Sequence, residues 1–274
     1  MNTIIIPTDF SPTAINAMNY AVGMAKEINA SIILFHAYQI PMTISEVPVQ
    51  MVNIEEMRKD AEKHLQLLKE KIEHVTSGSL KIYKECRLGN TEDELEDYCK
   101  SIDPIAIVMG SRGSSNLDRV LFGSTTLTVI RHLSWPVIAI PPGKEYHPIK
   151  KIGFACDFKH VVETTPVDTI EKFAKLFNAE LHILNVDYQD KHFTPDTPHE
   201  SVLLHTMLED LKPTYHFIED ADIGNGINRF AEENNIDLII AIPKKHKLLE
   251  SIFHQSGSKK ILFASHIPIM CIHE

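Results

Sequence analysis

Short apolar runs alternate with amphipathic stretches along the first half of the chain. The apolar runs are typical of buried strands, and they cover residues 2–7, 31–37, 80–86, 105–109 and 136–140. Between them, residues with helical character follow Ser11-Pro12, span about 54–72 and 91–101, and follow Gly123. This alternation predicts an α/β fold in which helices cover both faces of a parallel sheet.

The same pattern appears a second time after a proline-rich break. Pro141-Pro142-Gly143-Lys144 has the composition of a linker, and residues 152–158 then parallel residues 4–10. The later apolar runs repeat the order of the first half, at 180–186, 214–219, 237–242 and 267–272. An internal repeat of this length predicts two similar domains, 1–143 and 151–274, joined by a linker at 144–150.

A set of glycines follows the fourth apolar run. Gly110, Gly113 and Gly123-Ser124 are arranged as G-x2-G-x9-G-S. Glycine lets a backbone approach a ligand closely, and the start of a helix offers free N–H groups to an anion. Neither a Walker A loop nor a G-x-G-x-x-G fingerprint is present. The frame therefore predicts a phosphate-binding loop of another kind, although turn glycines without a ligand are the alternative.

This frame resembles the nucleotide-binding signature of the universal stress protein family, in UspA-like domains of the ATP-binding kind. The resemblance implies two tandem Rossmann-like (UspA/HUP-type) domains, each with a five-stranded parallel sheet of order 3-2-1-4-5. Strands 1 and 4 are then neighbours, and a crevice opens at their carboxyl ends. Pro7-Thr8-Asp9 and Gly110 follow these two strands, so both stretches are expected at the crevice.

The resemblance also assigns expected roles to single residues. The nucleoside would lie against Pro7, Thr8 and Asp9, and the base would lie beside Ala37 and Met109. The ribose and phosphates would be wrapped by Gly110, Ser111, Arg112, Gly113 and Ser114. The phosphate tail would be held by Gly123, Ser124 and Thr125. The plainer alternatives are a turn aspartate at residue 9, core residues at 37 and 109, and a solvated arginine at 112.

The implied ligand is ATP, or AMP or ADP, and magnesium could accompany its phosphates. The second half departs from the glycine frame, because Ile242, Lys245 and Gln255 stand where the first half has glycines, and Pro243 lacks an N–H. One nucleotide per chain is therefore expected, in the first half. Lys244, Lys245 and Lys247 are interpreted as a solvated basic loop.

Composition narrows the class of protein further. The net charge of −10 argues against nucleic acid as a partner, and no apolar run is long enough to span a membrane. The four cysteines lack metal-ligand spacing and, with the absence of a leader sequence, indicate a cytoplasmic protein. No paired acid and base can be assembled, so an enzyme is not expected.

Two alternatives to a nucleotide-binding regulatory module stay open. One is a slow ATP hydrolase or adenylate-transferring enzyme, and the other is a protein-interaction dimer without nucleotide. Family domains pair through their fifth strands, which correspond here to Val137–Ile140 and Ile269–Ile272. The resemblance therefore implies pairing of the two domains within one chain, and further association into a homodimer.

Overall fold

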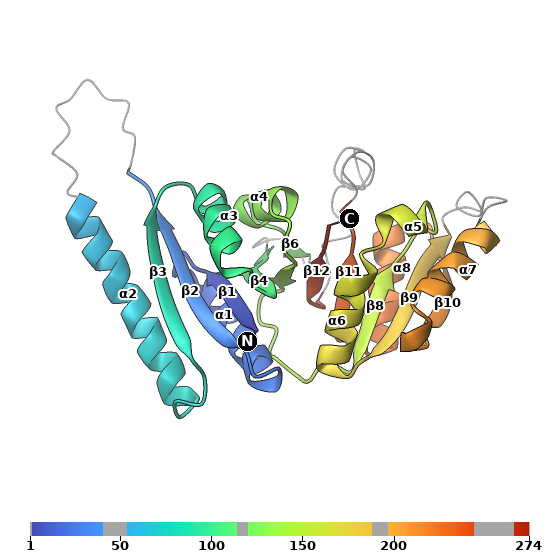
Figure 1. Cartoon of the computed structure of the whole chain (residues 1–274), viewed down its shortest axis with the longest axis horizontal. Coiled ribbons are helices and arrows are strands. Elements are labelled where there is room, and N and C mark those ends of the chain that lie inside the picture. The colour runs from blue at the N-terminus through green and yellow to red at the C-terminus, as the bar shows by residue number, and fades with distance from the viewer. Residues whose placement is uncertain (1, 41–53, 114–119, 188–196, 244–265, 274) are drawn as a thin grey trace, which may run out of the picture.

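The computed structural model describes residues 2–40, 54–113, 120–187, 197–243 and 266–273 (Figure 1). The two halves of the sequence form two similar units, which lie side by side along the longest axis of the molecule. Among the described residues, no helix combines the length and the apolar composition needed to cross a bilayer.

The first half is a parallel sheet of order β3-β2-β1-β4-β7. Its strands are β1 (Thr3–Pro7), β2 (Ser31–Tyr38), β3 (Ile82–Leu88), β4 (Ala106–Gly110) and β7 (Val137–Ile140). Its helices are α1 (Pro12–Glu27), α2 (Ile54–Val75), α3 (Thr91–Ile102) and α4 (Ser124–His132). A short antiparallel hairpin of β5 (Arg112–Gly113) and β6 (Val120–Leu121) interrupts the alternation of strands and helices between β4 and α4.

The second half repeats this arrangement as β10-β9-β8-β11-β12. Its strands are β8 (Lys151–Ala155), β9 (Glu180–Asp187), β10 (Thr214–Glu219), β11 (Leu238–Ala241) and β12 (Ile269–Cys271). Its helices are α5 (Val161–Thr164), α6 (Val167–Phe177), α7 (Thr197–Met207), the 3-10 turn η1 (Glu209–Leu211) and α8 (Ile223–Glu233). The predicted α/β class and the strand order 3-2-1-4-5 are confirmed in both halves.

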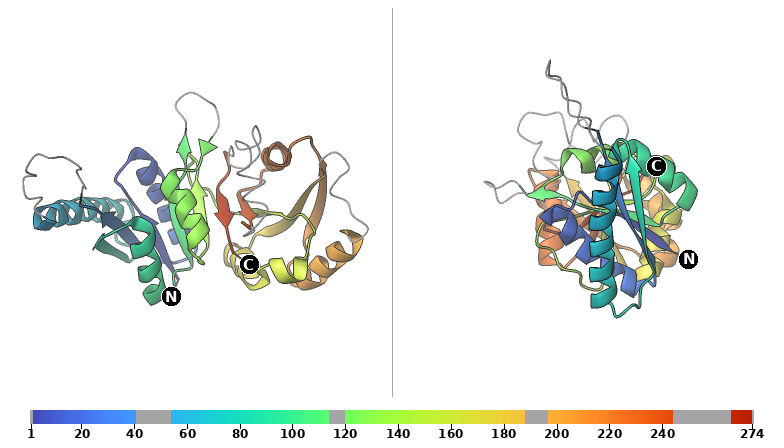
Figure 2. Two further views of the ribbon diagram at one scale, coloured as in Figure 1. Left: turned by 90° about the horizontal axis from the view of Figure 1, so that it is seen from above. Right: turned by 90° about the vertical axis from the view of Figure 1, so that its left-hand side faces the viewer.

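Strands β7 and β12 pair in antiparallel fashion and join the two sheets into one of ten strands (Figure 2). The register places Met270 opposite Ile138, and both side chains are fully buried. Beyond β12, His273 Nε2 lies 2.6 Å from the carbonyl oxygen of Ile130 in α4. Strands β7 and β12 thus cover each other's apolar edge, which would otherwise be open to pairing with another chain.

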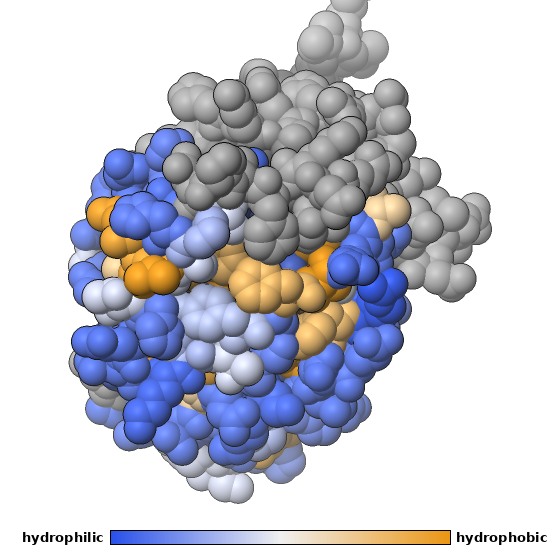
Figure 3. Space-filling model, turned by 90° about the vertical axis from the view of Figure 1, so that its right-hand side faces the viewer, coloured by the Kyte–Doolittle hydropathy of each residue, from blue (hydrophilic) through white to orange (hydrophobic). Residues whose placement is uncertain are grey.

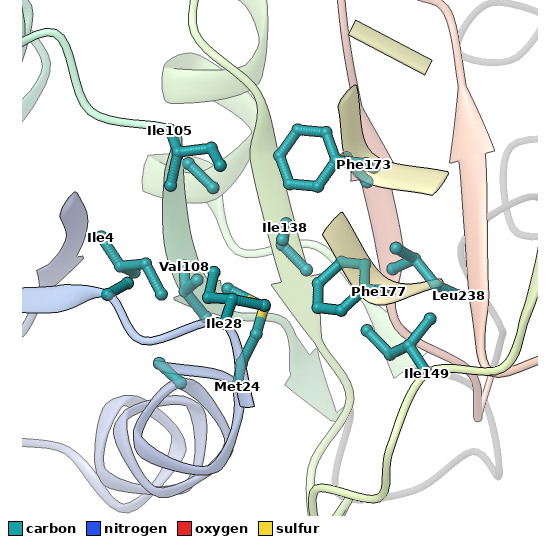
Figure 4. Close-up of a cluster of buried hydrophobic side chains, with 14 of the residues drawn as sticks. Ile4, Met24, Ile28, Ile105, Val108, Ile138, Ile149, Phe173, Phe177 and Leu238 are labelled. Carbon is teal, nitrogen blue, oxygen red and sulfur yellow. The ribbon is translucent and has the colours of Figure 1, made fainter. Parts of the chain in front are cut away.

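Side chains of both halves also share one hydrophobic core. Phe177 of α6 lies beside Ile138 of β7, and Met24 and Ile28 of α1 lie in the same cluster (Figure 4). The segment between the halves is tied down as well, since the Tyr146 ring sits so close to Gly23 that an added Cβ there would approach it to 2.6 Å. The two halves are therefore packed against each other rather than loosely tethered.

The two outer edges of the ten-stranded sheet differ in chemistry. The β3 edge carries charged residues, and Arg87 is paired with Glu85 at 2.8 Å. The end of the molecule that holds β10 and α7 is mostly hydrophilic, with hydrophobic side chains gathered across its middle (Figure 3). Phe217 of β10 and Val202 of α7 are exposed. Charge is a common device for blocking edge-to-edge association, and the β3 edge carries such charges.

The shared core predicts that the halves unfold together. Phe177→Ala removes a buried ring and should lower the free energy of unfolding by about 3–5 kcal/mol. Trp135 is the only tryptophan and belongs to the first half, so its fluorescence reports on that half alone. In urea titrations, we expect the Trp135 transition to shift together with the transition in circular dichroism.

The matched control is Phe217→Ala, because Phe217 is 55% exposed and its loss should change stability far less. A Trp135 transition that stayed in place in Phe177→Ala would contradict the coupling of the two halves.

Candidate functional site

A cavity of about 210 Å³ opens at the carboxyl ends of β1 and β4. This is the position at which open parallel sheets bind ligands, because the connections from these two strands leave in opposite directions. Its walls come from the first turns of three helices as well as from the strand ends. The lining residues are Pro7, Thr8, Asp9, Ser11, Thr13, Ala14, Phe35, Ala37, Thr91, Met109, Gly110, Gly123, Ser124, Thr125 and Thr126.

The loop after β1 is held by hydrogen bonds to its own side chains. The amide of Phe10 donates to Thr8 Oγ1 at 3.0 Å, and the amide of Ser11 donates to Asp9 Oδ1 at 3.0 Å. Ser11 in turn caps α1 by accepting from the Ala14 amide at 3.2 Å. These bonds stabilise Phe10 at a φ of 63°, which costs a bulky residue about 1–2 kcal/mol. The loop therefore presents Thr8 and Asp9 to the cavity in a fixed conformation.

Gly110 is the last residue of β4 and lies against the first turn of α1. A Cβ built on it would lie 2.6 Å from Thr13 Cγ2 and 2.7 Å from the Thr13 carbonyl oxygen. Its own carbonyl accepts from Thr126 Oγ1 of α4 at 3.0 Å. The absence of a side chain at residue 110 is thus explained by helix packing, and it also brings α1 and α4 close to the cavity.

The N-terminus of α4 has no side-chain cap, unlike that of α1, which Ser11 caps. Gly123 is its N-cap and has no side chain that could accept from the first amides of the helix, and no acidic residue lies in its first turn. Helix α3 also begins at the cavity, with Thr91, but Glu92, Asp93 and Glu94 already occupy its first turn. Since a helix N-terminus favours negative charge, an anion would gain more at α4 than at α3.

Several of the lining residues are apolar. Phe35 is fully buried and Met109 is 7% exposed, while Pro7 and Ala37 complete this apolar set. Asp9 is exposed, and among the residues described in the lining it is the one that ionises. The lining thus combines apolar side chains, one carboxylate and a hydroxyl-rich helix start with Ser124 and Thr125.

Of the predicted site residues whose side chains the structure describes, Ser111 does not line this cavity. Ser111 is 2% exposed, and both its amide and its hydroxyl donate to the carbonyl of Ile140, at 2.9 and 3.0 Å. The Ser111 hydroxyl is therefore bonded within the sheet, whereas Ser111 was expected beside the ribose and phosphates. Arg112 and Gly113 form β5 of the hairpin, and Ser114 lies outside the described residues.

The structure adds lining residues that the sequence analysis did not single out as site residues. They are Ser11, Thr13, Ala14, Phe35, Thr91 and Thr126. Ser11 and Thr91 stand at helix starts that the hydrophobic pattern had located, and this position was the available signal. Phe35 and Thr126 carry no such signal.

The second half keeps the loop but changes the residues around it. Phe158 has a φ of 50° and its amide donates to Cys156 Sγ at 3.4 Å, as Phe10 does to Thr8. Ile242 stands where the first half has Gly110, and it packs against the hydrophobic core. The remaining predicted departures, Lys245 and Gln255, lie outside the described residues, as do Lys244 and Lys247.

Metal-binding clusters and disulfides are absent from the part of the chain that the structure describes. It brings together no group of three or more His, Cys, Asp or Glu side chains that could hold a metal ion. All four cysteines are described and none forms a disulfide, and burial raises the pKa of Cys99 and of Cys271 to about 12. These two thiols are therefore unreactive structural residues.

Fold and site together define a tandem α/β protein, with two Rossmann-like halves and a cavity at the strand ends of the first. The model of the universal stress protein family matches residues 1–141. The chain therefore belongs to the universal stress protein family.

The chain is similar in sequence to one individual protein and in fold to two solved structures. The universal stress protein MJ0531 of Methanocaldococcus jannaschii is 26% identical over 145 residues, which are 52% of this chain and 83% of that protein. A universal stress protein structure from Archaeoglobus fulgidus is 19% identical with a TM-score of 0.72, covering 99% of this chain and 98% of that one. A putative universal stress protein structure from Pseudomonas aeruginosa is 11% identical with a TM-score of 0.64, covering 100% of this chain and 93% of that one.

The contact at Gly110 yields a prediction about stability. Gly110→Ala should lower the free energy of unfolding by about 1–3 kcal/mol, because α1 must move away from β4. Adding Thr13→Ala should restore only part of this loss, since the clash with the Thr13 backbone remains. Thermal and urea unfolding of the single and double variants measure the effect. Full restoration by Thr13→Ala would show that only the Thr13 methyl group matters.

Proposed function

We propose that this chain is a regulatory universal stress protein that binds one adenine nucleotide, in the cavity of its first half. The observation that carries the proposal is the uncapped N-terminus of α4, which lines the same cavity as several apolar side chains and the carboxylate of Asp9. A nucleotide has matching parts, namely an anionic tail, a flat base and a ribose with hydroxyl donors.

The proposed pose follows from this chemistry. The base would lie against Ala37 and Met109, and Asp9 would accept hydrogen bonds from the nucleoside. The phosphates would lie at Gly123-Ser124-Thr125, where backbone amides and hydroxyls are the donors. Ligand pockets usually measure about 300–1,000 Å³. The cavity is smaller, so part of the nucleotide would extend beyond the described walls.

Magnesium, if it accompanies the nucleotide, would be held mainly by the phosphates. Mg²⁺ keeps several waters and often uses only one or two protein carboxylates. Asp9 is the carboxylate among the described lining residues, and its Oδ1 already accepts from Ser11. In the proposed pose Asp9 is used by the nucleoside, so the residues present fit a metal bound through the phosphates and water rather than through a protein carboxylate.

We further propose that binding is not followed by catalysis. An ATP hydrolase or adenylate transferase needs a base or an activated nucleophile near the reacting phosphorus. The described lining near α4 offers hydroxyls and amides but no histidine, lysine or cysteine. The cytoplasm is the proposed compartment, supported by the four cysteines of the chain, none of which forms a disulfide.

Association of two chains into a homodimer is proposed as well, independently of the nucleotide. The fifth strands already pair within the chain, so the contact would need another surface. The β10 end, where Phe217 and Val202 are exposed, is a candidate surface. A mass of one chain in light scattering would refute the homodimer.

Gly123→Asp tests the proposed phosphate position. The φ of −65° and ψ of 155° at residue 123 suit aspartate, a favoured N-cap residue, so the helix should be as stable as before or more stable. The new carboxylate would accept the amides that a phosphate needs and would repel it. In calorimetric titration, we expect one ATP site per wild-type chain. In Gly123→Asp, the ATP affinity should fall at least about tenfold.

The matched control is Asn90→Asp at the N-cap of α3, where the first turn is already acidic and little change in affinity is expected. If Gly123→Asp bound ATP as tightly as the wild type, the proposed position of the phosphates at the N-terminus of α4 would be refuted. Two equivalent sites per wild-type chain would contradict the assignment of the site to the first half alone.

A further inference from the structure

His36 connects β2 to the loop that carries Asp9. Its Nδ1 lies 2.7 Å from the carbonyl oxygen of Thr8, the first residue after β1. A carbonyl oxygen can only accept, so Nδ1 carries the hydrogen in this contact. The amide of Thr8 donates to the Phe35 carbonyl at 2.9 Å. Both backbone groups of Thr8 are thus bonded to consecutive residues of β2.

The second half makes the same contact with a different side chain. Asn185 of β9 donates from Nδ2 to the Cys156 carbonyl at 2.8 Å, and the Cys156 amide donates to the Leu184 carbonyl at 2.9 Å. Asn185 is buried at 4% exposure. The two halves share few residues here, so the common feature is an N–H donor aimed at this carbonyl.

A ring contact adds to the hydrogen bond in the first half. The centroid of the Phe10 ring lies 4.5 Å from the centroid of the His36 ring and 5.2 Å from that of the His64 ring on α2. Phe10 is the residue with positive φ, directly after Asp9. His36 therefore contacts the loop on both sides of Asp9, at the Thr8 carbonyl and at the Phe10 ring.

We propose that His36 is a positioning residue for the nucleotide, because its hydrogen bond to the Thr8 carbonyl holds Thr8 and Asp9 in the orientation that faces the cavity. This inference rests on the proposed nucleotide site. His36 itself does not line the cavity, so it acts on the ligand only through the loop.

Three variants separate the hydrogen bond from the ring contact. His36→Asn keeps a donor of the kind that Asn185 provides, His36→Phe keeps a ring without the donor, and His36→Ala keeps neither. His64→Ala is the matched control, because it removes the other ring from Phe10 and leaves the Thr8 bond intact. Thermal unfolding verifies that each variant is folded before it is compared.

Two readouts are measured on the full chain. The first is amide hydrogen exchange at Phe10 and Ser11 without ligand, since both amides are bonded within this loop. The second is the ATP dissociation constant by calorimetry. In His36→Ala and His36→Phe we expect faster exchange and an affinity about three- to tenfold weaker, the effect of one lost hydrogen bond. In His36→Asn and in His64→Ala, the exchange rates and the ATP dissociation constant should both stay within about twofold of the wild-type values.

Unchanged exchange in His36→Ala, or equal losses in His36→Ala and His36→Asn, would overturn the positioning role. Absence of ATP binding by the wild-type chain would instead refute the proposed function. The exchange comparison would still show in that case whether His36 fixes the loop.

Discussion

The first turn of α1 packs so closely against the end of β4 that residue 110 has no room for a side chain. The Thr13 carbonyl oxygen would lie 2.7 Å from a Cβ at that position. Because of this contact, the start of α1, the loop after β1 and the start of α4 converge on one small volume. The cavity is a consequence of this helix packing in the first half, and a ligand would use a space that the packing leaves open.

The elements were largely predictable because each has a local signal. Ser11 and Pro12 start α1 as expected, with Ser11 Oγ accepting from the Ala14 amide. The apolar periodicity located α2, although β3 begins at Ile82 rather than at the buried Leu80. The two-residue strands β5 and β6 are too short to leave a periodic pattern, so the hairpin could not be predicted.

The site was predictable only where the glycine frame and the family resemblance named residues. Thr126 lines the cavity because its hydroxyl reaches the Gly110 carbonyl, a long-range contact with no motif. Ser111 stands next to that glycine in sequence, but the pairing of β4 with β7 turns its hydroxyl to the Ile140 carbonyl. Sequence neighbours thus face different surroundings, and only the strand register decides which of them a ligand can reach.

Comparison of the two halves shows which features of the loop after the first strand are kept when the residues around the cavity change. Phe158 keeps the positive φ of Phe10 although Cys156 replaces Thr8, so this loop conformation does not depend on the threonine hydroxyl. Ile242 fills the position of Gly110, and the helix that corresponds to α1 is divided into α5 and α6 by Thr165-Pro166. A broken first helix accompanies the larger side chain.

The antiparallel contact of β7 with β12 makes the pairing of the two halves independent of protein concentration. Two separate domains joined in this way would dissociate on dilution, whereas a covalent connection keeps the partner at a local concentration of about millimolar or higher. The arrangement around the cavity should therefore be the same at trace abundance as at high expression. Subunit exchange with other members of the family is also disfavoured at this surface, because β7 and β12 of the same chain stay paired with each other.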